Sequence, residues 1–254
     1  MSYSFLKESK LFLVYSGSKY RIYTSSAISF SQTFASDSYS VKTLHDQSKM
    51  FDGATITKAN PANFEIDVPL TVEKDESIII DLLSDLTSAQ LKSFDIYVQT
   101  EQSTFKLENA IITGGALDFS PENPFTVRLQ GEGTKFSKAG NASYTIPGSA
   151  VSESATRTPL MVYPVVSVDS LDMNNIASVT LNIQNNIDWT PFETLQSSLA
   201  VTNSSNIMRA SSYTVSKRVI SGAISQYQTN NNITQFDDFS TSANITLKAV
   251  RMGE

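Results

Sequence analysis

Apolar and polar residues alternate with a period of two along most of the chain. Segments 64–68, 125–129 and 179–183 each place their apolar side chains on one side of an extended strand. In an antiparallel sheet, such strands turn one face to a core and the other to water or a partner. The pattern predicts a mainly β protein, with further strands at 27–34, 63–71, 94–99, 178–185, 213–227 and 243–250.

One segment has helical spacing instead. Between residues 75 and 91, apolar side chains recur every three or four positions, at Ile79, Leu82, Leu83 and Leu86. Asp75 or Ser77 is suited to cap the first turn, and the acidic run 73–76 suits the positive end of a helix dipole. We expect one or two short helices here, packed across a sheet, and a shorter helix at 234–239.

Gly114 and Gly115 separate two apolar runs, 109–112 and 116–119. Glycine readily adopts the positive φ that tight hairpin turns require, so these residues predict a turn between two strands. With the next strand at 125–129, the prediction is a three-stranded meander.

The alternation fades between residues 131 and 159, where Gly, Ser, Ala and Thr predominate. Such a composition predicts a linker or exposed arm at 141–158. On both sides of it the order is strand, long polar segment, strand, helix, strand, which indicates a tandem duplication. We therefore expect two β domains, at 1–140 and 159–254, although the second half lacks a counterpart of 105–133.

The chain is poor in charge. Of its 254 residues, 17% are charged, against about 25% in an average soluble domain, and the formal net charge is −6. Uncharged polar residues replace the missing charges, as suits surfaces that pack against other protein. Basic residues do not cluster, which argues against conventional nucleic-acid recognition.

Residues for catalysis are scarce. The chain has no cysteine, so it has no disulfide, thiolate nucleophile or cysteine zinc site, and His45 is its only imidazole. The run 131–133, Gly-Glu-Gly, lacks the lysine and the strand-to-helix context of a phosphate loop. The apolar stretch 11–14 is too short for a signal segment or membrane span. We expect no enzyme activity, cofactor, metal site or membrane segment.

Two long polar segments, 35–60 and 186–212, exceed the roughly 12–15 residues usual for a structureless loop. Both carry apolar residues, which a projecting loop or hairpin cannot bury by itself. We expect contacts between subunits at ten of them: Tyr39, Val41, Leu44, Met50, Phe51, Trp189, Phe192, Leu195, Ile207 and Met208. The alternative is that each segment folds back on its own domain.

The first half resembles the major tail tube proteins of long-tailed, siphovirus-type bacteriophages with non-contractile tails. The resemblance is carried by the order of AISFSQTF (27–34), FEIDVPL (64–70), FKLENA (105–110) and FTVRLQGEG (125–133) around a long loop and a helix. The duplicated second half is similar to the tandem-domain variety of that family.

This resemblance implies two tandem tail-tube-type β-sandwich or half-barrel domains, each with a short helix packed on a sheet. It implies a structural virion protein whose sheets join edge to edge in rings. For a chain with two tandem domains, the resemblance implies rings of three copies with pseudo-sixfold symmetry. The rings would assemble in the host cytoplasm, stack into a tube that delivers genome DNA without specific binding, and contact other tail proteins.

Two alternatives come from other classes of protein. One is a carbohydrate-binding or adhesin-type β-sandwich, which is expected to expose aromatic residues on one sheet face. The other is a different tail component, such as a terminator or distal tail protein. Self-assembly into tubes would distinguish the tube protein from both.

Overall fold

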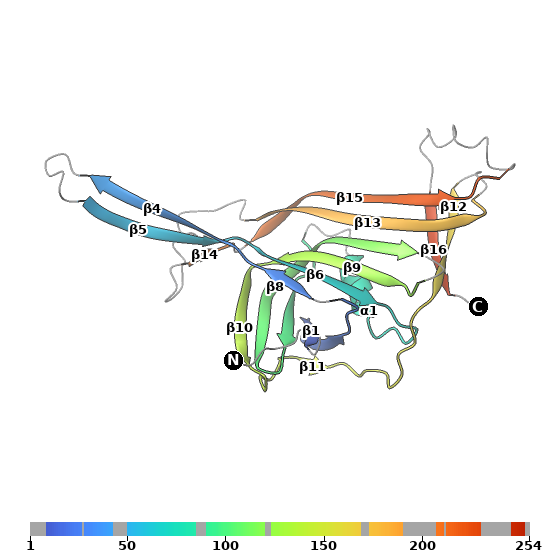
Figure 1. Cartoon of the computed structure of the whole chain (residues 1–254), viewed down its shortest axis with the longest axis horizontal. Helices are drawn as coiled ribbons and strands as arrows, with labels where there is room; N and C mark the ends of the chain where they lie inside the picture. Colours follow the sequence, from blue (N-terminus) through green and yellow to red (C-terminus); the bar gives the residue numbers. More distant parts are fainter. Residues whose placement is uncertain are drawn as a thin grey trace.

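The computed structural model describes residues 9–26, 28–42, 50–84, 90–119, 123–168, 173–189, 207–210, 212–229 and 245–251. For 36–42, 50–57 and 208 it describes the backbone alone. Figure 1 shows a β-rich body, a hairpin that projects far from it, and a small ribbon at the opposite end. The expected mainly β fold is confirmed.

Strands make up nearly all the regular structure in these residues. In the first half they are β1 (Lys10–Tyr15), β2 (Ser18–Ile22), β3 (Ser29–Ser31), β4 (Phe34–Lys42), β5 (Met50–Ala59), β6 (Ala62–Pro69), β7 (Phe94–Gln99), β8 (Ser103–Phe119), β9 (Thr126–Gly133) and β10 (Lys135–Asn141). They continue with β11 (Ser149–Ala150), β12 (Val162–Val168), β13 (Ile176–Trp189), β14 (Ile207–Arg209), β15 (Tyr213–Gln226) and β16 (Ile245–Arg251).

The long strand β8 organises an 11-stranded mixed sheet. Its first half pairs with β7 and β10, whereas its second half pairs with β9 and β13. On one side the path continues through β7, β1 and β2 to β11, and on the other through β9 and β6 to β3, with β15 beyond β13. Bulges interrupt the pairing of β8 near residues 109–113, and bulges bend strands. The two halves of β8 thus belong to two parts of the sheet that enclose a core.

One core cluster includes residues from both halves of the chain. Alternating residues of β6 and β9, such as Ile66, Val68 and Val127, are at most 2% exposed. The cluster extends into β12 and β13 through Val162, Val166, Val168, Val179 and Ile183. The apolar face that the period of two predicts is therefore the buried face.

The only helix in the described residues is α1 (Ser77–Leu83), which buries Ile78, Ile79, Leu82 and Leu83. It lies within the expected segment but is shorter, and residues 85–89 lie outside the description. The expected capping is wrong: Glu76 stands at the N-cap without a side-chain hydrogen bond to the backbone. The helix expected at 234–239 lies outside the described residues.

The turn expected at Gly114–Gly115 is wrong, and so is the meander built on it. Both residues lie within β8, which continues to Phe119, and neither has positive φ. Gly115 instead allows α1 to approach, because a Cβ there would lie 2.5 Å from Leu83 Cδ1. Gly115 thus leaves room for the helix to pack closely on the strand and does not form a turn.

The second half extends the sheet of the first half. β13 pairs with β8 over residues 179–184, and β15 pairs along the whole of β13. β12 and β16 form a separate antiparallel ribbon of two strands. The strands expected at 178–185, 213–227 and 243–250 are present, but they do not display a second tandem domain. The boundaries near residues 140 and 158 stay a prediction.

Candidate assembly surfaces

One face of the sheet around β9 is polar across five strands. The register places Ser29, Glu65, Gln130, Gly114 and Gln184 in one row from β3 through β6, β9 and β8 to β13. The neighbouring row runs through Asp67, Arg128, Ala116, Asn182 and Ser221. The opposite face of the same strands carries the buried core, so this polar face is the outward one.

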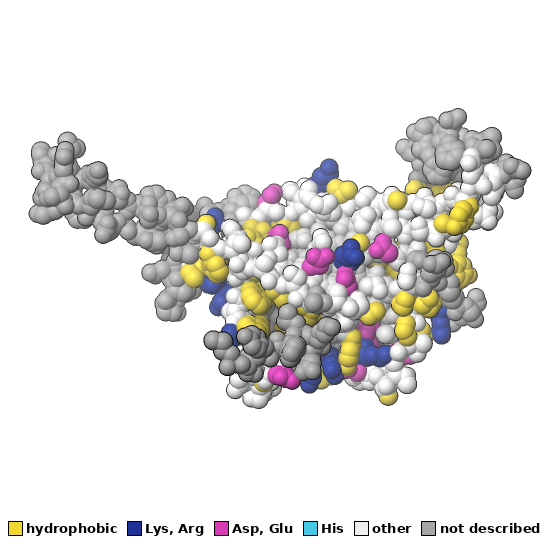
Figure 2. Space-filling view, in the orientation of Figure 1, with side chains coloured by type: hydrophobic (Ala, Val, Ile, Leu, Met, Phe, Trp, Pro, Cys, Tyr) yellow, Lys and Arg dark blue, Asp and Glu magenta, His cyan; other side chains and the backbone are white. Residues whose placement is uncertain are grey.

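Acidic groups outnumber basic ones on the central strands of the polar face. β6, β8 and β9 contribute the carboxylates Glu65, Asp67, Asp118 and Glu132 and a single guanidinium, Arg128. Arg128 Nε lies 3.2 Å from Asp67 Oδ1 and so compensates one of the carboxylates. In Figure 2, acidic side chains surround a basic one at the centre of the front face, over β6 and β9.

An open groove of about 790 Å³ follows this face from β9 across β8 to β13. Polar and small residues line it, among them Arg128, Gln130, Glu132, Asn182 and Gln184. Such a surface offers hydrogen bonds and negative charge but no apolar platform, which is unlike the mostly apolar site of a small ligand.

The polar face ends at two strand edges. Within the described residues, β15 pairs only with β13, and β3 pairs only with β6. β15 is 14 residues long and exposes Ile220, whose side chain is 55% accessible. A long open edge with an exposed apolar residue is a site for pairing with another chain.

The first long segment forms the β4–β5 hairpin, which Figure 1 shows projecting from the body. Its pairing sets Val41 opposite Phe51 and Lys42 opposite Met50, while Tyr39 lies at a bulge. Leu44 lies outside the described residues. A projecting loop or hairpin was the expected form of this segment, and it is a hairpin. Its contacts with another subunit stay a prediction.

The second long segment meets the first. β14, with Ile207 and Met208, pairs in parallel with the base of β5 over Thr57–Ala59. Phe192 and Leu195 lie outside the described residues. The structure therefore brings together the backbones of the two segments at the base of the hairpin, which the sequence pattern did not indicate.

Trp189 is fixed at the end of β13. Its Nε1 donates a hydrogen bond to Glu132 on the polar face, and its ring lies 5.3 Å from that of Tyr213, centroid to centroid. Tyr213 in turn donates its hydroxyl to the carbonyl of Leu91 at 2.8 Å. Trp189 was expected in a contact between subunits, and the structure gives it an intramolecular role at the start of the second long segment.

Residues 142–160, here called the strap, run from β10 to β12 across the edge of the sheet. Ser149 and Ala150 pair in parallel with Ser18 and Lys19 of β2, and the backbone N–H of Leu160 bonds the carbonyl of Leu70. The segment expected to be a linker or exposed arm is thus tied to the body at several points. By pairing with β2, it covers part of a sheet edge.

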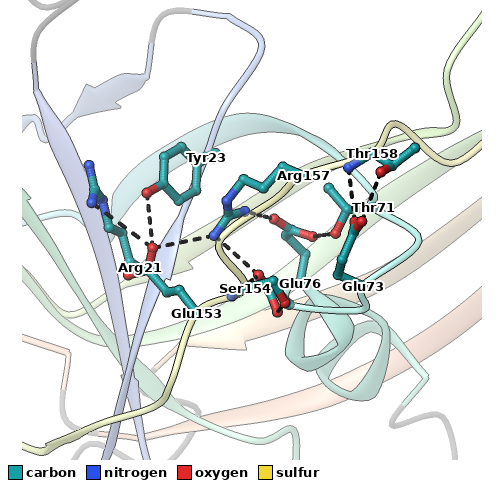
Figure 3. A network of polar contacts seen from close by, with 10 residues as sticks. Arg21, Tyr23, Thr71, Glu73, Glu76, Glu153, Ser154, Arg157 and Thr158 are labelled. Carbon is teal, nitrogen blue, oxygen red and sulfur yellow. Dashed lines mark hydrogen bonds and ion pairs between the residues drawn. The ribbon is translucent and has the colours of Figure 1, made fainter.

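Acidic residues before α1 hold the strap (Figure 3). Glu73 accepts bonds from the backbone N–H and hydroxyl of Thr158 at 2.9 and 2.8 Å, and Asp75 accepts two from Ser154, each 2.9 Å. The backbone N–H of Thr158 lowers the pKa of Glu73, and that of Ser154 lowers the pKa of Asp75. The acidic run expected to complement the helix dipole binds the strap instead.

Arg157 is the centre of this network. Its guanidinium binds Glu76, which is 1% exposed, and lies 3.4 Å from Glu153 and 3.5 Å from Asp75. It also stacks on the ring of Tyr23, 3.7 Å from the centroid. No sequence motif marked this cluster, because Arg157 and Glu76 are 81 residues apart and Tyr23 and Glu153 are 130 residues apart along the chain.

The described residues contain no cluster of three or more side chains of the kinds that bind metals. None of the helices in the described part of the chain is both long and apolar enough to cross a membrane.

The chain is similar to one family of known proteins and to solved structures. A family model described as the Bacteriophage Baseplate Tube Protein Family matches residues 1–252. Among solved structures, the sheath/tube terminator of an extracellular contractile injection system in its extended state is similar, at 11% identity and a TM-score of 0.39. That match covers 54% of this chain and 97% of the terminator. No curated protein matches.

Proposed function

Since the chain belongs to the bacteriophage baseplate tube protein family and is a structural component of the phage tail and baseplate, we propose that it assembles into closed rings around a lumen. The polar face would line the lumen, and the core and α1 would face outward. The ring would form part of the tube through which genome DNA leaves the particle.

The observation that carries this proposal is the polar face with an open strand edge on each side. The part of the sheet that carries the polar face, from β3 to β15, ends in an open strand on each side, so it can continue into the sheet of a neighbour, with β15 of one copy beside β3 of the next. Repetition of one such heterologous contact closes a ring when the rotation allows it, and closure removes both of these exposed edges.

The charges of the polar face suit passage of DNA. Four carboxylates on β6, β8 and β9 stand against Arg128 and, on β15, Lys217, so the face carries more negative than positive charge. Phosphate groups are repelled by such a surface, and the counterion release that drives DNA binding requires Lys or Arg contacts. DNA would therefore slide through the lumen without being held.

The finer features of the assembly belong to the same proposal. The resemblance to tandem-domain major tail tube proteins implies three copies per ring with pseudo-sixfold symmetry, and rings that stack. Membership of the baseplate tube family supports a position of this tube segment at the baseplate, where it would also contact other tail proteins. Mass measurement of the isolated ring distinguishes three copies from six.

Electron microscopy of the purified chain tests the proposal. We expect annular particles with a central channel, either single or stacked. In the variant Ile220→Lys, a charge on the open edge of β15 should reduce the fraction of chain in rings at least tenfold. The substitution leaves the fold intact because Ile220 is 55% exposed.

Val151→Lys is the matched control, since this valine is 41% exposed and lies in the strap, away from β15. It should assemble like the wild type. A wild-type chain that stays monomeric at high concentration contradicts the proposal, and glycan binding by that monomer would favour the carbohydrate-binding alternative.

A further inference from the structure

The middle of the strap, residues 147–159, is held almost entirely by polar contacts. Ile146, which is 6% exposed, anchors the strap before this stretch, and Leu160 packs against the core cluster after it. Between these two anchors every residue is exposed except Ser154 and Arg157, which are half-buried. No apolar side chain of this stretch is buried, so hydrophobic burial, the main stabilising effect in most folds, contributes little to holding it in place.

The contact of this stretch with β2 is short. The backbone N–H groups of Ser149 and Val151 donate hydrogen bonds to the carbonyls of Gly17 and Lys19, at 2.9 and 3.0 Å. Strand pairing extends over only two residues of the strap, Ser149 and Ala150. Such a short strand at a sheet edge separates at little cost, because few backbone hydrogen bonds are lost and water replaces them.

Carboxylates hold the rest of the stretch (Figure 3). The charged and titratable groups that meet there come from β2, from the residue after it, from the segment before α1 and from the strap itself: Arg21, Tyr23, Glu73, Asp75, Glu76, Glu153 and Arg157. Four of these groups are carboxylates, and they accept hydrogen bonds as anions. Protonation of a carboxylate weakens its hydrogen bonds, because charge-assisted bonds are about twice as strong as neutral ones.

Acid therefore acts on the attachment of the strap. The folded chain lowers the pKa of Glu73 and of Asp75 from their ordinary values of 4.5 and 3.8, chiefly through a backbone N–H of the strap in each case. A carboxyl with a lowered pKa stabilises the attached strap fully above its ordinary value, and this effect is lost as the pH falls through the lowered value. The strap is thus attached most firmly at neutral pH and loses two attachments in acid.

Detachment of the strap also resolves the buried charge of the network. Glu76 is 1% exposed, and its guanidinium partner, Arg157, belongs to the strap. Removal of that guanidinium alone leaves the carboxylate without either a partner or water. Movement of the whole stretch instead opens Glu76 to water at the moment when Arg157 leaves. The strap can therefore leave as a unit without an uncompensated buried charge.

We propose that residues 147–159 form an acid-released cover of the β2 edge, which detaches as a unit while the body stays folded. Protonation of Glu73 and Asp75 releases it. In the attached state it covers the edge at which the sheet path through β7, β1 and β2 ends. In the detached state, the N–H and C=O groups on that side of β2 become free to pair with another strand. This device is independent of the ring contacts proposed for β15 and β3.

Hydrogen exchange of the full chain between pH 7 and pH 3 tests the cover. The reporting amides are those of Ser149, Val151, Ser154 and Thr158, which all donate to the body. After correction for the intrinsic pH dependence of exchange, their protection should fall at least tenfold in acid, whereas the amides of β9 should stay protected. Equal protection of the strap at both pH values overturns the proposal, and so does simultaneous loss of protection in the strap and in β9.

The double variant Glu73→Gln/Asp75→Asn examines whether these two carboxylates are the trigger. Its strap should be less protected than that of the wild type at pH 7 and should change little between pH 7 and pH 3, because side-chain amides do not titrate. Glu65→Gln/Asp118→Asn removes two carboxylates from the polar face as the matched control and should behave like the wild type. A strap that responds to acid in the first variant as strongly as in the wild type contradicts the proposal.

A disulfide that locks the strap gives an independent test, because the chain has no cysteine of its own. Lys19 and Ala150 are partners in the strand pairing, so Lys19→Cys/Ala150→Cys places two thiols within reach of each other. The oxidised protein should keep the amides of Ser149 and Val151 protected at pH 3, whereas the same protein after reduction should lose this protection. Equal exchange in the oxidised and reduced forms overturns the proposal.

Discussion

The guanidinium of Arg157 binds the carboxylate of Glu76, which is 1% exposed, and so joins the strap to the beginning of α1. Glu76 also accepts a hydrogen bond from the Thr71 hydroxyl at 2.7 Å. A buried carboxylate requires such partners because water is no longer available to solvate its charge. The strap is therefore held by a contact whose loss leaves an uncompensated charge.

Removal of the guanidinium in Arg157→Ala should lower the free energy of unfolding by about 3 kcal/mol, the usual cost of breaking a buried ion pair from one side. Arg157→Lys should lose less, because it keeps the charge but not the planar group that stacks on Tyr23. Denaturant unfolding measures both. An alanine variant as stable as the wild type would show that the pair contributes nothing.

Stability should fall in acid because the folded chain holds the pKa values of Glu73 and Asp75 below their ordinary values of 4.5 and 3.8. A carboxyl with a lowered folded pKa stabilises fully above its unfolded pKa and loses this effect as the pH falls through the folded pKa. The melting temperature should thus decrease below about pH 4.5. The double variant Glu73→Gln/Asp75→Asn should show a shallower decrease, and parallel curves would contradict this account.

A side chain at Gly131 should be poorly tolerated, whereas one at Gly114 should be accepted. A Cβ at Gly131 would overlap the ring of Phe64 and the carbonyl of Ile111, whereas a Cβ at Gly114 has its nearest neighbour at 3.5 Å. We expect Gly131→Ala to cost about 2 kcal/mol of stability, typical of overpacking a core. Gly114→Ala serves as the control in the same thermal unfolding measurement, and equal losses in both variants would refute the packing argument.

The fluorescence of the chain reports on the end of β13, because Trp189 is its only tryptophan. Glu132→Gln replaces the charged acceptor of the indole N–H, so the emission maximum should shift and stability should fall by about 1.5 kcal/mol. Asp118→Asn removes a carboxylate from the same sheet face, farther from Trp189 along the strands. It should change neither the emission maximum nor the stability. An unchanged spectrum in Glu132→Gln would mean that the indole finds its partner elsewhere.

Local sequence patterns predicted most accurately the strands whose side chains are buried at every second position. The alternation in 64–68 and 125–129 indicated β6 and β9 and their buried faces, because a strand against a core must alternate. Gly114 and Gly115 misled the turn prediction, since glycine serves close packing as well as positive φ. Likewise, the position of the carboxylates at 73–76 predicts an interaction with the helix dipole, whereas Glu73 and Asp75 bind residues 85 and 79 positions away in the chain.

Composition and periodicity alone indicate a β-rich, charge-poor chain with two long polar segments and an element order that resembles tube proteins. Long-range contacts in the folded chain establish that β13 extends the sheet at β8, that β14 lies beside β5 and that Arg157 holds the strap. Periodicity records which face of a strand is buried, but strand pairing and ion pairs depend on residues far apart in the chain, for which a local pattern carries no signal.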